Sequence, residues 1–330
     1  SAGADPGPIC YGRGGTRLTV TDAQVWLGRI PPEHFLGGRM KIHREKIRQP
    51  LRRLARQLKL GLEAAAEGVL AVANANIVRA LRVLSLERGY DPRDFLLLPF
   101  GGAGGLHAAD LAEELGMGRI LLPPHPGLLS ALGMAFADYR KDYVRTLLWP
   151  ASAAGFGRLQ RQLADLKRQA ERQARDEGIA AASQKIRASL DLRYRGQSHE
   201  LSVPFGPRWK SAFESEHLRR FGYRHRRRPL EVVNLRLELS AREARPPVDF
   251  SAASAASRPA AEFNRLHWNG RWIEAPVHRR QGLAAGFSAA GPALLVEPSA
   301  TAFLKPGWKM TVAAQGHLLF ENKTVRRPRG

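Results

Sequence analysis

Residues 96–107 read Leu-Leu-Leu-Pro-Phe-Gly-Gly-Ala-Gly-Gly-Leu-His, an apolar run that stops at a turn of four glycines. The run from Asp94 to Phe100 predicts a short strand, and the apolar spacing from Leu106 to Leu115 predicts a helix. In such a unit, free backbone amides and the positive end of the helix dipole point at one spot. Glycine suits the turn because a side chain would keep a ligand from the backbone and because the turn demands positive φ. The pattern predicts contact with an anion or a nucleotide; a tight packing turn is the alternative.

Amphipathic helices precede this turn. Apolar residues recur at helical spacing over residues 47–58 and again over 69–84, with a junction near Leu60-Gly61. After the turn, residues 119–124 predict a short buried strand, and residues 127–136 predict a helix of small residues. Residues 46–140 are therefore predicted to be α/β.

The second half of the chain has a different pattern. Residues 158–177 place Leu159, Leu163 and Leu166 on one face of a charged surface helix, and Gly178 is a stop signal. After this helix the pattern predicts mainly strands, so the last part of the chain is expected to be β-rich. The Ala/Ser/Pro-rich segment Phe250–Ala261 is the best candidate for a linker.

The composition indicates a globular chain of one or two domains with a strong positive charge. Of the 330 residues 44% are hydrophobic, and 52 Lys and Arg outnumber 30 Asp and Glu, which gives a net charge of +22. This charge invites a nucleic-acid interpretation. However, most of the cations are Arg, and Arg-, Ala-, Gly- and Pro-rich usage is typical of GC-rich coding, so we expect nucleic acid not to be a partner.

The single cysteine, Cys10, excludes an intrachain disulfide and fits a reducing compartment, so we expect a cytoplasmic protein. The longest uncharged stretch runs from Ile120 to Ala137, but it holds Pro123, Pro124 and Pro126, which argue against a membrane-spanning helix. We expect no membrane association. Because the chain opens on Ser1, it is expected to be a fragment or a processed product.

Other stretches give weaker signals for chemistry. Gly12-Arg13-Gly14-Gly15-Thr16 resembles the Asp-x-Gly-Gly-Thr turn that holds metal-bound phosphate, but Gly12 stands where the carboxylate is required. Asp5 and Asp22 are each interpreted as a turn former or a helix cap, with a metal ligand as the alternative. The ten histidines show no metal-ligand spacing, and Cys10 has no activating partner in the sequence.

The strongest basic cluster covers residues 217–228, where Phe221 and Tyr223 stand between arginines and histidines. It could grip phosphates or RNA bases, although a solvated or subunit-contacting loop is the favoured interpretation. Residues 194–199, Tyr-Arg-Gly-Gln-Ser-His, are polar within a strand pattern. They are interpreted as a turn, with a substrate-facing or interdomain loop as the alternative.

Several phrases, in order along nearly the whole chain, together resemble the hydantoinase A/5-oxoprolinase family, which includes acetone carboxylase subunits. The phrases are SAGADPGPICYGRGG (1–15), TVTDAQVWLGRI (19–30), FLGGRM (35–40), RALRVLSLERGYDPRDF (79–95), LLPFGGAGGLHAADLAEELG (97–116), PPHPGLLSALGMAFAD (123–138), DLRYRGQSHEL (191–201), FGYRHRRRPLEVVNLRL (221–237) and GPALLVEPSATAFLKPGW (291–308).

The resemblance implies an α/β fold with an actin-like (ribonuclease H-like) ATPase lobe, incomplete at the N-terminus, followed by a β-rich C-terminal region. It divides the chain into residues 1–140, the C-terminal part of the ATPase-like domain, and residues 141–330, the β-rich domain. In the family the glycine turn belongs to the adenosine-side motif, which assigns cofactor binding to Gly101, Gly102, Ala103, Gly104 and Gly105.

The resemblance also implies a function. Family members use ATP and Mg²⁺ to phosphorylate the carbonyl of a cyclic amide, such as a hydantoin or 5-oxoproline, and so favour ring opening. It implies a hydantoinase B-type partner subunit or domain and an oligomeric assembly. The two Asp-x-Gly-Gly-Thr turns of the family precede the matched region, so most of the phosphate and Mg²⁺ site is expected outside this chain, and we expect the isolated chain to have no turnover.

Three alternatives stay open at this point. The chain could be an acetone-type carboxylase subunit, because the same ATPase lobe serves both reactions. It could be a non-catalytic scaffold that has lost half of the site. It could also be a basic nucleic-acid-binding module, for which the charge and residues 217–228 are the only arguments.

Overall fold

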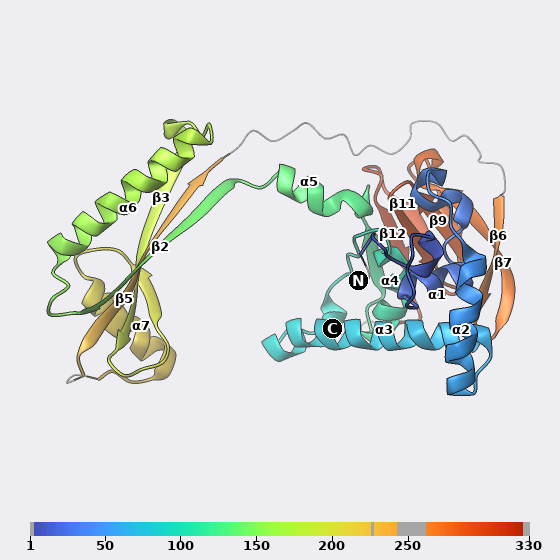
Figure 1. The fold of residues 1–330 in the computed structure, drawn as a ribbon, viewed down its shortest axis with the longest axis horizontal. Helices are drawn as coiled ribbons and strands as arrows, with labels where there is room; N and C mark the ends of the chain where they lie inside the picture. The colour runs from blue at the N-terminus through green and yellow to red at the C-terminus, as the bar shows by residue number, and fades with distance from the viewer. Residues whose placement is uncertain (1–2, 226–227, 243–261, 326–330) are drawn as a thin grey trace. The chain divides into compact units, whose positions relative to one another are not determined.

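The glycine turn lies in the larger of two units (Figure 1). A computed structural model describes residues 3–225, 228–242 and 262–325. The larger unit joins Ser1–Gly133 to Pro247–Gly330, and the smaller unit is Met134–Pro246.

Four α-helices of the larger unit come before residue 133. They are α1 (Val20–Trp26), α2 (Arg44–Leu58), α3 (Leu62–Leu84) and α4 (Gly104–Glu114). Helix α1 begins with a capping box, in which the Thr19 hydroxyl accepts from the Asp22 amide and the Asp22 carboxylate accepts from the Thr19 amide. Helices α2 and α3 meet at Lys59–Gly61, which confirms the predicted junction.

Two four-stranded sheets complete the larger unit. One sheet has the order β1 (Arg119–Leu122), β12 (Leu318–Glu321), β11 (Lys309–Val312) and β8 (Ser288–Ala290), and all neighbours are antiparallel. The other has the order β10 (Ala300–Leu304), β9 (Ala293–Glu297), β7 (Arg271–Arg279) and β6 (Glu262–Trp268). In this sheet β7 and β9 run parallel and the other neighbours antiparallel.

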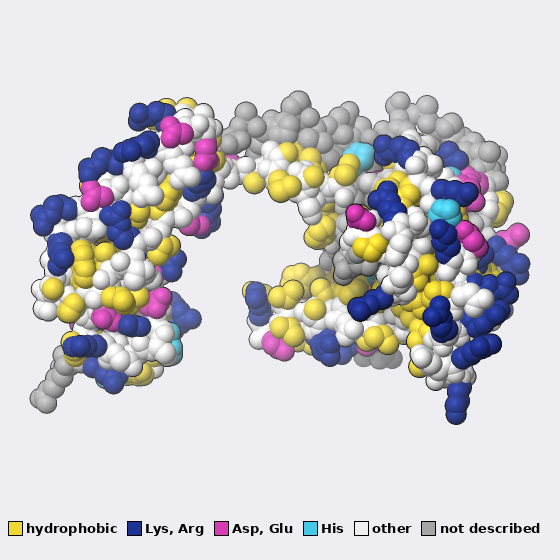
Figure 2. Space-filling view, viewed as in Figure 1, with side chains coloured by type: hydrophobic (Ala, Val, Ile, Leu, Met, Phe, Trp, Pro, Cys, Tyr) yellow, Lys and Arg dark blue, Asp and Glu magenta, His cyan; other side chains and the backbone are white. Residues whose placement is uncertain are grey.

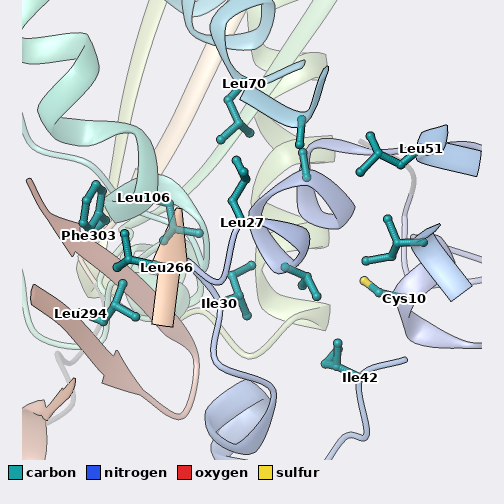
Figure 3. Packing of buried hydrophobic residues seen from close by; sticks show 14 of the residues in the cluster. Cys10, Leu27, Ile30, Ile42, Leu51, Leu70, Leu106, Leu266, Leu294 and Phe303 are labelled. Atoms are coloured by element: carbon teal, nitrogen blue, oxygen red, sulfur yellow. The ribbon is translucent and has the colours of Figure 1, made fainter. Parts of the chain in front are cut away.

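Helix α4 contributes to both apolar clusters of the larger unit. Leu106 packs into the first cluster with Leu27, Leu266 and Phe303, which come from distant parts of the chain (Figure 3). Ala108 belongs to the second cluster, whose other members include Ile120, Leu304, Trp308, Met310 and Phe320. The two clusters therefore hold residues 262–325 onto residues before 133.

The chain divides differently from the expected boundary at residue 140. The expected β-rich domain of residues 141–330 is split, because β12 pairs with β1 and β10 packs on α4. The apolar faces of these strands are buried only when residues 3–133 are present, which is why the last strands return to the first unit. The expected linker, Phe250–Ala261, lies outside the described residues.

The smaller unit is one antiparallel sheet with two helices. The strand order is β2 (Tyr139–Pro150), β5 (Leu230–Ala241), β3 (Gln184–Tyr194) and β4 (Leu201–Pro204). Helix α6 (Phe156–Asp176) confirms the predicted amphipathic helix, and α7 (Trp209–Phe221) lies among the predicted strands. The core gathers Leu159, Leu190, Phe213 and Leu235. Helix α5 (Leu129–Ala135) crosses the boundary between the units.

The helical stretch Leu62–Arg88 is long and apolar enough, by length and composition alone, to cross a membrane. Core helices and signal sequences pass the same test, and only 11% of the apolar 18-residue window is buried in the structure. In the larger unit Ala65, Ala66 and Leu70 of this stretch are buried in the first apolar cluster, against α1 and α2.

The packing of α4 predicts opposite effects for the same substitution at two helical glycines. A Cβ added at Gly105 would lie 2.5 Å from Ala302 Cβ and 2.9 Å from its Cα, whereas a Cβ at Gly68 of α3 would meet nothing within 4 Å. Gly105→Ala should lower the free energy of unfolding by about 1–3 kcal/mol. Gly68→Ala should raise it by about 0.5–1 kcal/mol, because alanine is the better helix former. Urea denaturation of both variants measures the difference; equal effects would contradict the packing described here.

Candidate functional site

The glycine turn is fixed by backbone hydrogen bonds from two other segments. Gly101 has φ of +84°, and its amide donates to the Pro126 carbonyl at 2.7 Å. The Gly102 carbonyl accepts from the Thr301 amide at 3.0 Å. Helix α4 begins two residues later, at Gly104. The predicted turn and helix are therefore confirmed, and the turn is held from both sides.

The prediction of a strand from Asp94 to Phe100 before the turn is wrong in its extent. Only Leu97 forms a bridge, in which its amide donates to the Arg119 carbonyl at 3.0 Å and its carbonyl accepts from the Leu121 amide at 2.9 Å. Pro99 has no amide to donate. Leu96, Leu98 and Phe100 are 41%, 44% and 57% exposed, so this apolar run is not a buried strand.

Three amides at the turn have no acceptor among the residues that the structure describes: those of Gly102, Ala103 and Gly105. Gly102 and Ala103 are exposed, whereas Gly105 is buried. Ala103, the N-cap residue of α4, offers no side-chain cap. The first amides of a helix and the positive end of its dipole attract anions. The exposed edge of the turn can therefore bind an anionic group.

Of the five residues assigned to cofactor binding, some are open to a ligand, and others serve the turn itself or its packing. Gly105 lies against Ala302 and serves helix packing. Gly101 needs its positive φ to make the turn. Gly102 and Ala103 form the edge that is open to a ligand, and Gly104 begins the helix. The void that touches Gly105 holds only about 10 Å³, so a ligand would meet the exposed edge and not a closed pocket.

The turn of residues 123–128 packs against the glycine turn and the β9–β10 hairpin. A Cβ at Gly127 would lie 2.1 Å from the Ser299 carbonyl oxygen, so only glycine fits. A buried ion pair supports this junction: Arg280 Nη1 lies 3.2 Å from Glu297 Oε1, and Arg280 Nη2 donates to the Leu122 carbonyl at 3.0 Å. Burial raises the pKa of Glu297 and Arg280 opposes it, while burial lowers the pKa of Arg280.

A polar network fixes the opposite face of α4. Lys305 Nζ donates to Asp110 Oδ1 at 2.7 Å and to Glu113 Oε2 at 2.5 Å. Trp308 Nε1 donates to the second oxygen of Glu113 at 2.8 Å. Burial lowers the pKa of Lys305, but its hydrogen bonds to the two carboxylates and their negative charges outweigh burial, so the pKa lies above its usual value.

The network continues toward α1 and α3. His107 Nδ1 donates to Asn74 Oδ1 at 2.6 Å, and Asn74 Nδ2 donates to Asp110 Oδ2 at 3.3 Å. Arg29 Nη1 lies 3.9 Å from Asp110 Oδ2. Burial lowers the pKa of His107 and of Arg29, so His107 is neutral at pH 7. The network could not be predicted from the sequence, because its members lie far apart along the chain. Its only local signal was the presence of the acidic residues Asp110 and Glu113 on the largely apolar helix α4.

Other singled-out residues have structural roles. Asp22 is fully buried, caps α1 and accepts from the Cys10 amide at 2.8 Å, which confirms its interpretation as a cap. Cys10 is buried, and burial together with Asp22 raises the pKa of its thiol, so it is not an activated nucleophile. Within residues 3–225, 228–242 and 262–325, no group of three or more His, Cys, Asp or Glu side chains could hold a metal ion.

In the smaller unit the structure brings residues 194–199 and 217–225 together. His217 is buried, its Nδ1 donates to the Tyr223 carbonyl at 2.8 Å, and its Nε2 lies 3.4 Å from the Gln197 amide nitrogen. Tyr194 packs edge-on against His217 and His225. The first residues of the basic cluster therefore end helix α7 and pack locally, while Arg226 and Arg227 lie outside the described residues.

The chain is similar to known proteins over most of its length. Residues 1–143 match the family described as Hydantoinase/oxoprolinase. The chain is 33% identical over 330 residues to caprolactamase subunit alpha of Pseudomonas jessenii, and the match covers 94% of this chain and 47% of the relative. It is 30% identical over 351 residues to 5-oxoprolinase PfmaA of Pestalotiopsis fici, and this match covers 98% of this chain and 27% of the relative.

The match places residues 1–143 of this chain in the hydantoinase/oxoprolinase family. Two solved structures are also similar to this chain. A nucleotide-free acetone carboxylase matches with a TM-score of 0.78 at 22% identity, and the Pseudomonas jessenii caprolactamase with 0.67 at 32%; each match covers 98% of this chain and 49% of the other. These likenesses confirm the predicted fold class, an actin-like α/β ATPase fold. The chain spans about half the length of the caprolactamase subunit.

The network on α4 predicts the effect of removing Lys305. Lys305→Met should lower the free energy of unfolding by about 1–3 kcal/mol at pH 7, because Asp110 and Glu113 would lose a charged donor. Since the pKa of Lys305 is raised in the fold, its contribution is fully present below the ordinary lysine pKa of about 10.4 and is lost only as pH rises through the raised value. The decrease in the free energy of unfolding caused by Lys305→Met should therefore be the same at pH 7 and pH 9.

The matched control is Lys309→Met, which removes an exposed lysine of β11 that has no ion-pair partner in the described part of the chain. Chemical denaturation should leave this variant within about 0.5 kcal/mol of the parent chain. If both variants lose the same stability, the contacts of Lys305 do not stabilise α4.

Proposed function

We propose that this chain supplies the glycine-turn side of the nucleotide site of an ATP-dependent enzyme that opens a cyclic amide. The observation that carries the proposal is the exposed edge at Gly102 and Ala103, where unengaged amides lie at the positive end of α4. Membership of the hydantoinase/oxoprolinase family supports the use of ATP at this edge.

The residues of the chain would hold the nucleotide as follows. The amides of Gly102 and Ala103 would donate to its oxygens, and the dipole of α4 would favour its negative charge. The bonds from Gly101 to Pro126 and from Thr301 to Gly102 keep the turn in place, so these donors need no rearrangement when the ligand arrives. When bound, ATP supplies the phosphoryl group that activates the ring carbonyl.

Magnesium has no ligand set among the described residues, because they contain no cluster of three or more candidate ligands. We therefore assign no Mg²⁺ ligand in this chain. The proposal that Mg²⁺ accompanies ATP rests on the family resemblance alone.

The substrate class and the partner follow from relatives. One relative is named a caprolactamase and another a 5-oxoprolinase, which supports a lactam, 5-oxoproline or a hydantoin as substrate. The caprolactamase relative is named as subunit alpha, which supports assembly with a further subunit, proposed to be of hydantoinase B type. A cytoplasmic location is part of the proposal and rests on the single, buried Cys10.

Substitutions at Ala103 separate nucleotide binding from folding. Ala103→Asp would cap α4 and keep or raise stability, but its carboxylate would occupy amides at the open edge and repel a negatively charged nucleotide. We expect ATP to bind the chain in isothermal titration calorimetry and Ala103→Asp to weaken its binding by at least about tenfold. Ala103→Ser is the control, because it caps the helix without charge and should bind within about threefold of the parent chain. Unchanged binding by Ala103→Asp would contradict a nucleotide at this turn.

The reaction is tested on the full-length protein together with its partner subunit. Caprolactam, 5-oxoproline and hydantoin are supplied with ATP, and phosphate release and ring-opened product are measured with and without bicarbonate. A cyclic amide hydrolase should release product equally in both conditions. Failure to open any of the three rings, together with bicarbonate-dependent phosphate release when acetone is supplied in place of the cyclic amide, would instead identify an acetone-type carboxylase. Ring opening by the isolated 330-residue chain would contradict the expectation that it has no turnover.

A further inference from the structure

A second glycine-rich segment, Gly12–Arg17, lies outside the site described above. Gly12 and Gly14 have φ of +71° and +91°. The preceding backbone is fixed, because the Asp22 carboxylate accepts from the amides of Cys10 at 2.8 Å and Ile9 at 3.3 Å. The Cys10 carbonyl in turn accepts from the His43 amide at 2.7 Å, which ties the segment to the start of α2.

The amides of this segment are available to a ligand. Among the described residues, none of the amides from Arg13 to Arg17 has a hydrogen-bond acceptor. All five residues are exposed or half-buried. Successive backbone amides around a glycine with positive φ make a concavity that binds anions.

The side chains of His43, the N-cap residue of α2, and of Lys46 in the first turn of α2 lie directly against Gly12. A Cβ added there would lie 2.6 Å from His43 Cδ2, 3.0 Å from His43 Nε2 and 3.3 Å from Lys46 Nζ. The other ring nitrogen of His43, Nδ1, lies 2.9 Å from Glu45 Oε1, which orients the ring so that Nε2 is directed to Gly12. Lys46 Nζ has no carboxylate within ion-pair distance in the part of the chain that the structure describes.

The charges around this point are unbalanced. Arg44 and Lys46 stand in the first turn of α2, where the helix dipole disfavours cations, and Glu45 is the one acidic residue of that turn. Arg44 is engaged elsewhere, since it donates to the Trp26 carbonyl at 2.7 Å and lies over the Trp26 ring. Lys and Arg side chains gather over the region of α2 in Figure 2. Lys46 and His43 therefore remain as groups that an anion at Gly12 would stabilise.

We propose that Gly12–Arg17, His43 and Lys46 form a binding site for a phosphate group, either inorganic phosphate or the phosphate of a larger ligand. The amides of Arg13–Arg17 would donate to its oxygens, Lys46 would supply the charge, and His43 Nε2 would contact it from the side. The turn lacks the carboxylate of a metal-bound phosphate loop, so this site binds phosphate without a metal. The inference does not depend on the proposed nucleotide contact at Gly102 and Ala103.

Titration of the purified 330-residue chain with inorganic phosphate and, separately, with AMP tests the site. We expect saturable binding that Lys46→Gln weakens by about tenfold, because a charged donor is lost. His43→Ala should also weaken it. Lys309→Gln changes the net charge equally at a distant strand and should leave binding unchanged. Inorganic phosphate that binds as tightly as AMP identifies free phosphate as the ligand. Tighter binding of AMP that persists in Ala103→Asp, where the glycine turn is blocked, and is weakened by Lys46→Gln identifies a phosphate ester.

Two results would overturn the proposal. One is the lack of saturable binding of either probe by the parent chain. The other is an equal loss in Lys46→Gln and Lys309→Gln, which would show that the net charge alone attracts phosphate. Ala103→Asp should leave phosphate binding at this site unchanged, so failure of one site is distinguishable from failure of the other.

Discussion

The larger unit depends on the close contact between α4 and β10. Gly105 lets the helix approach Ala302 to a distance that no side chain allows, and Leu106 and Ala108 then enter the two apolar clusters. Lys305, at the end of β10, fixes the far part of the helix through Asp110 and Glu113. The position of the helix start, and with it the open edge of the glycine turn, follows from this contact.

The same contact explains the division of the chain. Strands β8–β12 bury apolar side chains against α4 and β1, and β9 and β10 also contribute to the first apolar cluster, so these strands fold with the first 133 residues. Residues 134–246 bury their own core around Leu190 and Phe213 and form a separate unit. In the sequence, this unit is inserted between the two segments of the larger unit. Local pattern predicted α2, α3 and α6, which have clear apolar spacing, but it did not predict α7. It could not predict which unit a strand would join, because that depends on partners nearly two hundred residues away.

The candidate site could be predicted only in part. The glycine turn was visible because its composition forces one backbone geometry, and the resemblance to the hydantoinase/oxoprolinase family assigned it a ligand. The supporting contacts were not visible: Pro126, Thr301 and Lys305 reach the turn or its helix only through the tertiary fold. The short strand before the turn was overestimated, because Leu96 and Leu98 are apolar but exposed. At Gly12–Thr16 the missing carboxylate argued against a metal-bound phosphate, while the approach of His43 and Lys46 could not be inferred from spacing.

Hydrogen exchange of individual amides, followed with and without ATP, tests the central claim most directly. The account predicts that the amides of Gly102 and Ala103, which exchange fast in the free chain because they have no acceptor, become protected when ATP binds. ATP binding that leaves these two amides unprotected would contradict the assignment of the nucleotide to the glycine turn.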